Sequence, residues 1–107
     1  MKFLFDGGGR HVANFVKGQL YSPKGENVGH YLEDKRIFVD MDGAYLGEII
    51  HENRIVYNLG SIYRGVAVGK LGNYPNVGNF GSAGNCGVIG AMAGYEDIPL
   101  ERLGQGL

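Results

Sequence analysis

The stretch IFVDMDGAYLGEII, residues 37–50, decides the fold because it reads as two strands joined by a tight turn. β-Branched and aromatic residues precede Asp40, and a second apolar-rich run follows Gly43, as is typical of paired strands. The carboxylate of Asp40 can accept hydrogen bonds from backbone amides of the turn. Gly43 stands where a type I turn with a bulge needs a positive φ, which glycine adopts without strain. The stretch therefore predicts a β-hairpin.

The same template recurs four times, at intervals of about 16 to 18 residues. The four units open at Asp6, Ser22, Asp40 and Asn58. In the first three units a glycine follows three residues later, whereas the fourth unit has Gly60 two residues later and should use another turn type. Seven residues after each opening stands a small residue: Ala13, Gly29, Gly47 and Gly65. The repeat predicts an all-β fold of four β-hairpin repeats over residues 3–74, in a pseudo-four-fold arrangement.

Because alternate residues of a strand share a face, the strand after each turn can be sorted into two faces. One face carries the small column and a larger apolar column: Phe15, Tyr31, Ile49 and Ala67. The other face carries a polar column, which Val66 interrupts: Asn14, His30 and Glu48. We place the aliphatic column Val12, Val28 and Leu46 on this second face. Neither face is polar enough for water, so we expect the strands to pack on both faces or to bury one in an oligomer.

These features resemble the bacterial four-fold β-flower domain. The resemblance covers residues 3–74 and consists of the hairpin template, two G-x-x-x-G steps and one run of five residues. These are Gly25/Gly29, Gly43/Gly47 and Tyr45-Leu46-Gly47-Glu48-Ile49. The resemblance implies a β-hairpin repeat protein from a family of mostly unknown function, and it implies no catalytic residues. A weaker resemblance, to a PRC-barrel-like module, depends only on residues 43–50.

Composition narrows the class of protein. The 107 residues predict a single domain, 1–107. A net charge of −1 and scattered Lys and Arg argue against nucleic-acid binding. The single cysteine excludes an intrachain disulfide framework and an all-cysteine zinc site. No apolar stretch approaches the ~20 residues of a membrane span, and the apolar start is too short for a signal peptide, so we expect a cytoplasmic protein with no membrane partner.

Residues 75–107 form a glycine-rich extension, with glycine at every third position from Gly78 to Gly90. Without proline in the other slots these triplets cannot hold a collagen helix. Two interpretations stay open: a loop followed by a short apolar element at 88–93, or an extended segment whose glycine edge lies against another backbone, such as a neighbouring subunit. At the end of the chain, residues 97–103 indicate a short helix with Pro99 near its start.

The polar column is the leading candidate site. If the repeats surround an axis, Asn14, His30 and Glu48 converge, and an imidazole beside a carboxylate can bind a metal or relay protons. Three unlike residues make a poor metal signature, however, and hydrogen-bonded structural groups or a solvated rim are the main interpretation. We therefore expect no catalytic residues, no metal and no cofactor, and we treat the column as a weak ligand-binding candidate.

The other motifs indicate a functional site less strongly than the polar column does. We expect Cys86 to be an inert thiol, and His11 and His51 to be exposed near turns. The run Gly7-Gly8-Gly9-Arg10 reads as a turn rather than an anion cradle, since no helix follows it. The seven tyrosines, which include Tyr45 and Tyr63 in one column, are expected in cores and cross-strand pairs rather than along a binding groove.

The sequence as a whole favours a non-enzymatic interaction or assembly module. We expect a homo-oligomer that associates through the glycine-rich C-terminal region, with a different protein partner also open. The alternative is a small ligand-binding protein or enzyme that uses the column of Asn14, His30 and Glu48. The two functions differ in whether those three side chains point into one concavity.

Overall fold

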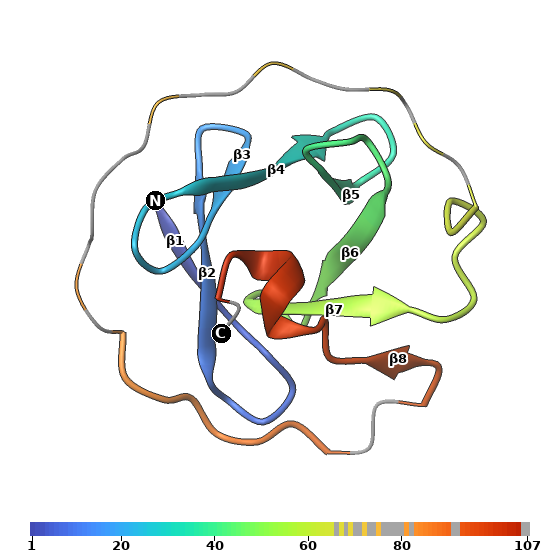
Figure 1. The fold of residues 1–107 in the computed structure, drawn as a ribbon. Helices are drawn as coiled ribbons and strands as arrows, with labels where there is room; N and C mark the ends of the chain where they lie inside the picture. Colours follow the sequence, from blue (N-terminus) through green and yellow to red (C-terminus); the bar gives the residue numbers. More distant parts are fainter. Residues whose placement is uncertain are drawn as a thin grey trace.

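The chain forms an all-β fold, a closed barrel of seven strands with an eighth strand added to the last (Figure 1). The structure is a computed structural model that describes residues 1–65, 67, 69, 72, 75, 81, 83–90 and 93–105. The strands are β1 (Lys2–Phe5), β2 (His11–Val16), β3 (Gln19–Tyr21), β4 (Asn27–Leu32), β5 (Ile37–Asp40), β6 (Tyr45–Ile50), β7 (Arg54–Asn58) and β8 (Tyr95–Glu96). Successive strands pair antiparallel, and a parallel pairing of β1 with β7, at Phe5 and Arg54, closes the barrel. The predicted all-β class is confirmed.

Three hairpin turns have the geometry that the repeat predicts. The amides of Gly9, Gly25 and Gly43 donate to the carbonyl oxygens of Asp6, Ser22 and Asp40, at 3.1, 2.9 and 3.0 Å. The three glycines have φ of 90°, 94° and 85°. Because only glycine adopts such angles without strain, this one residue type sets the position of each turn. The side-chain oxygen of each opening residue also accepts from turn amides, as in the bonds from Asp42 and Ala44 to Asp40 Oδ1.

A β-bulge follows each of these three turns, and it corrects one sequence expectation. The register on the second strand skips one residue in every hairpin: Val12, Val28 and Leu46. A bulge places two successive side chains on the same side of a sheet. This column therefore packs in or against the barrel interior beside the small column, and not on the opposite face where we expected it.

The fourth unit differs from the other three. Its glycine comes one residue early, so the amide of Gly60 bonds Oδ1 of Asn58 and the amide of Ser61 donates to the Asn58 carbonyl. Among the described residues no second strand follows this turn before residue 95; Ala67 forms only an isolated bridge with Ala44, and Val66 lies outside the described part. The strand that pairs with β7 is instead β8, which comes from the end of the chain.

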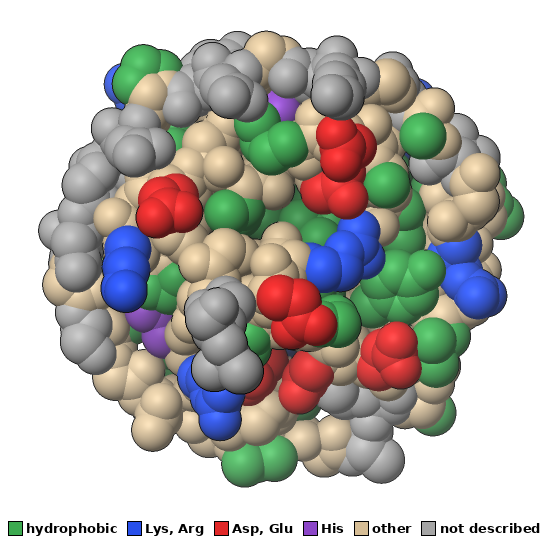
Figure 2. All heavy atoms as spheres, in the orientation of Figure 1, with side chains coloured by type: hydrophobic (Ala, Val, Ile, Leu, Met, Phe, Trp, Pro, Cys, Tyr) green, Lys and Arg blue, Asp and Glu red, His purple; other side chains and the backbone are tan. Residues whose placement is uncertain are grey.

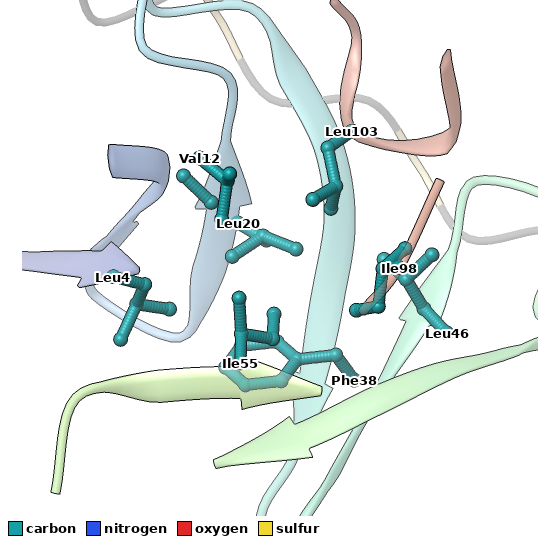
Figure 3. Close-up of a cluster of buried hydrophobic side chains, with 9 residues drawn as sticks. Leu4, Val12, Leu20, Phe38, Leu46, Ile55, Ile98 and Leu103 are labelled. Carbon is teal, nitrogen blue, oxygen red and sulfur yellow. The ribbon is translucent and has the colours of Figure 1, made fainter. Parts of the chain in front are cut away.

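The barrel interior is filled by aliphatic and aromatic side chains and is sealed by the end of the chain (Figure 3). Its fully buried members include Leu4, Leu20, Phe38, Leu46 and Ile55, with Phe15, Tyr31 and Ile49 packed against them. Ile98 and Leu103 belong to the same cluster. Leu103 ends a 3₁₀ helix, η1 (Leu100–Leu103), which lies over the centre of the ring of strands in Figure 1. We call residues 95–105 the C-terminal plug.

The outer face of the barrel is also packed. A second cluster, Ile37, Val39 and Tyr45, lies on the outside of β5 and β6, and Tyr63 from the segment after β7 packs against it. At β5 and β6 the sheet is therefore packed on both faces, which was one of the two outcomes that the sequence predicted. No helix among the described residues is long and apolar enough to cross a membrane.

Residues 83–90 of the glycine-rich extension lie on the outside of the barrel. Over residues 83–90 it has no regular secondary structure, and the amides of Cys86 and Ile89 donate to the carbonyls of Gly9 and Gly7, at 2.8 and 3.1 Å. Every third side chain, those of Ala83, Cys86 and Ile89, is half-buried, whereas the intervening glycines are exposed. Residues 83–90 thus lie against the backbone of their own barrel, with Gly84, Gly87 and Gly90 exposed; Gly78 lies outside the described residues.

Candidate functional site

The polar column Asn14, His30 and Glu48 faces away from the barrel interior. Each residue stands between two neighbours whose positions face or pack against the core, such as Gly47 and Ile49 on either side of Glu48. The three residues lie on β2, β4 and β6, so a full strand separates each from the next. Strands two apart lie roughly 9–10 Å from each other, and side chains on the outside of a barrel diverge. The column therefore does not converge into one concavity.

Asn14 is completely buried and belongs to a small polar contact of its own. Its Oδ1 lies 2.6 Å from Nε2 of His11, and its Nδ2 has no hydrogen-bond partner among the described residues. The ring of His11 packs edge-on against Phe3, at 5.0 Å between centroids, and tilted against Phe5. His11 is thus half-buried, and the prediction that it is exposed was wrong, because the two phenylalanines of β1 flank its ring.

Glu48 is held by two hydrogen bonds from the strand pair around it. Tyr45 Oη donates to Oε2 at 3.0 Å, and Asn58 Nδ2 donates to Oε1 at 3.1 Å. The backbone amide of Asn58 in turn donates to Tyr45 Oη. Burial, with the nearby Glu48 charge adding to it, raises the pKa of Tyr45 to about 12. Both carboxylate oxygens are engaged, so this group holds β6 and β7 together rather than facing a substrate.

His30 is buried, with 4% of its surface exposed, and burial lowers the pKa of its imidazole from the ordinary 6.5. The unfolded chain therefore binds more protons than the folded chain as the pH falls below about 6.5. We expect the urea midpoint to drop between about pH 7.5 and pH 5.5, since protonation favours unfolding. His30→Gln should weaken this dependence, whereas His51→Gln, at an exposed position, should keep it. An unchanged slope in His30→Gln would contradict this assignment.

Arg54, which the sequence analysis missed, joins distant segments of the chain through its buried guanidinium group. Its Nη1 donates to the carbonyl of Asp6 at 3.1 Å, its Nη2 to the carbonyl of Gly87 at 2.5 Å, and its Nε to Oδ1 of Asn53. Arg54 is 7% exposed and so joins the first turn, the start of β7 and the extension. The sequence held one signal for it, since Arg54 stands at the start of the apolar run that forms β7. An arginine in a buried strand needs hydrogen-bond partners, so this position indicated a polar contact.

The run Gly7-Gly8-Gly9-Arg10 is a turn, as predicted, and one of its amides binds a carboxylate of the same chain. The Gly7 amide donates to Oδ1 of Asp97 at 2.8 Å. Arg102 of η1 bonds both Oδ2 of Asp40 and the Tyr45 carbonyl, at 3.1 and 3.0 Å. These contacts tie the C-terminal plug to two of the repeated turns. Sequence spacing could not reveal them because they join residues far apart in the chain.

The remaining candidate residues do not gather into a catalytic or metal-binding cluster within the described part of the chain. Cys86 is half-buried, and its Sγ accepts a long contact of 3.8 Å from Asn53 Nδ2. His51 is exposed. Tyr45 and Tyr57 form a tilted ring pair at 5.0 Å, as expected for cross-strand aromatics. Within the described part of the chain, no three His, Cys, Asp or Glu side chains gather to hold a metal ion.

Charges of both signs are interspersed on the face shown in Figure 2, in line with the net charge of −1. No family model, curated protein or solved structure matches this chain.

Proposed function

We propose that this chain is a non-enzymatic assembly module that associates with further copies of itself. The observation that carries the proposal is the location of the exposed apolar side chains. Besides Met1, the large exposed apolar residues of the described part are Leu59, Ile62 and Val88, and all three lie on the chain outside the barrel. Ile62 and Val88 are 81% and 77% exposed. Leu59 and Ile62 stand three residues apart directly after β7, and neighbouring exposed apolar side chains of this kind support a contact with another chain.

The arrangement of the polar groups supports a structural rather than a chemical role. The barrel interior is packed with apolar side chains, and the column of Asn14, His30 and Glu48 diverges on the outside. Asn14 bonds His11 of its own strand, and Glu48 accepts from Tyr45 of its own strand and from Asn58 of the neighbouring β7. The alternative, a ligand-binding protein or enzyme that uses this column, gains no support from this geometry.

The proposal also covers the origin of the four repeated segments. We infer that the strands descend from one hairpin unit placed four times about the barrel axis, with β8 completing the fourth pair, and that the chain is related to the bacterial four-fold β-flower domain. Three hairpins with the same turn and the same bulge support this arrangement. Superposition of the backbones of β1–β2, β3–β4, β5–β6 and β7–β8 in an experimental structure tests it. A cytoplasmic location remains part of the proposal.

Self-association is tested by the mass of the protein in solution. Light scattering at micromolar concentration should give a multiple of the 11.6 kDa chain mass. Because Ile62 is exposed, Ile62→Ser should leave the fold intact and weaken association about tenfold, which corresponds to about 1.4 kcal/mol of lost apolar contact. Lys24→Ser, which changes an exposed side chain in the turn between β3 and β4, should leave association unchanged. A wild-type mass equal to that of one chain would overturn the proposal.

A further inference from the structure

The connection between β7 and β8 is far longer than the two strands require. Asn58 and Tyr95 are direct cross-strand partners, and the Leu59 amide donates to the Gly94 carbonyl at 2.9 Å. Antiparallel neighbours of this kind are usually joined by two to five residues. Here 36 residues, 59–94, intervene, and ten of the twenty glycines of the chain lie in them. Connections of this length in a compact domain usually have a function of their own.

The C-terminal plug at the end of this connection is a self-contained element. Internal bonds hold it, since the amides of Arg102 and Gln105 donate to the carbonyls of Pro99 and Leu100. Ile98 and Leu103 enter the core at the barrel mouth, Arg102 bonds Asp40, and Gln105 Nε2 donates to the Val12 carbonyl at 2.7 Å. The plug also contacts the barrel through β8, which pairs with β7. The barrel mouth therefore presents apolar, anionic and carbonyl groups that match this one segment.

We infer that two copies of this chain exchange their C-terminal plugs, so that each barrel mouth holds residues 95–105 of the other copy. The inference rests on the proposed self-association and names its mechanism. Fully extended, 36 residues span about 120 Å, whereas the largest dimension of the molecule is 35 Å. The plug can thus reach a neighbouring barrel and make the same contacts there. Since every plug contact is preserved, exchange changes only the path of residues 59–94 and is a low-cost route to a dimer.

The described residues of the connection contact their own barrel at several points. Tyr63 packs against the outer cluster, the amides of Cys86 and Ile89 donate to the first turn, and Arg54 donates to the Gly87 carbonyl. Opening the closed form breaks these contacts together with those of the plug, and the protein concentration then decides between the closed and exchanged forms.

The pairing of Asn58 with Tyr95 gives a direct test. Because Leu59 and Gly94 are a hydrogen-bonded pair, Asn58 and Tyr95 form the closer, non-hydrogen-bonded pair, where two cysteines can form a disulfide. In a Cys86→Ser background, one tagged chain carries Asn58→Cys and a second, differently tagged chain carries Tyr95→Cys. The two chains are unfolded together, refolded at micromolar concentration and oxidised.

Exchange predicts a disulfide between the two tagged chains in about half of the dimers, the statistical share of mixed pairs for a symmetric assembly. A mixture of Asn58→Cys with Glu33→Cys, a change at an exposed position in another turn, should give none. Dimers by light scattering without the 58–95 disulfide would overturn plug exchange and leave self-association standing. Single chains by light scattering would overturn both.

Discussion

Leu103→Ala is expected to lower the free energy of unfolding by about 2–5 kcal/mol, as large-to-small changes in a packed core do. Leu103 is 1% exposed and touches the same cluster as Leu20 and Ile55. Small domains are stable by only about 5–15 kcal/mol, so this single change removes a large share. Deletion of residues 95–107 removes Ile98 and Arg102 as well and is expected to leave the barrel unfolded. Urea unfolding followed by circular dichroism measures both effects.

Glu101→Ala is the matched control for this prediction, because Glu101 is exposed and lies on the same 3₁₀ helix as Leu103. Its effect should stay within about 0.5 kcal/mol, the usual range for surface substitutions. If Leu103→Ala and Glu101→Ala had equal midpoints, the C-terminal plug would not be part of the core. The glycine-rich extension, residues 75–107, includes Leu103. If Leu103→Ala is unstable, deletion of the whole extension would unfold the barrel and could not test the role of the extension in association.

Gly47→Val is expected to lower the free energy of unfolding by about 2–3 kcal/mol through overpacking, although valine is the better strand former. A Cβ at this position would lie 2.6 Å from the carbonyl oxygen of Val56 and 2.7 Å from Cδ1 of Ile98. The first is backbone of the neighbouring strand and cannot move without disturbing the barrel. The close contact that the small column predicts is therefore present at Gly47.

Gly87→Val provides the comparison for this change. No atom lies within 4 Å of a Cβ placed at Gly87, which is exposed on the outside of the barrel. The change there should leave the urea midpoint within the small range of surface substitutions. Equal midpoints for Gly47→Val and the wild type would mean that β6 and β7 can move apart, contrary to the packing described above.

Local chemistry explains what the sequence by itself determined. The positions of the first three turns follow from Gly9, Gly25 and Gly43, because a positive φ is a property of the residue and needs no distant partner. The small column and the polar column lie on opposite faces because successive side chains of a strand alternate between its two faces, which is also a local property of the chain. The all-β class and the differing fourth turn after Asn58 were predictable for the same reason.

The tertiary structure decided the rest, because the remaining features depend on contacts between residues far apart in the chain. The bulges that turn Val12, Val28 and Leu46 inward appear only in the register of the paired strands. The divergence of Asn14, His30 and Glu48 depends on which strands lie between them. Arg54 and the C-terminal plug find their partners across 48 and 62 positions of sequence, in the bonds to Asp6 and Asp40. Such pairings carry no periodic signal, and only the folded chain brings these groups together.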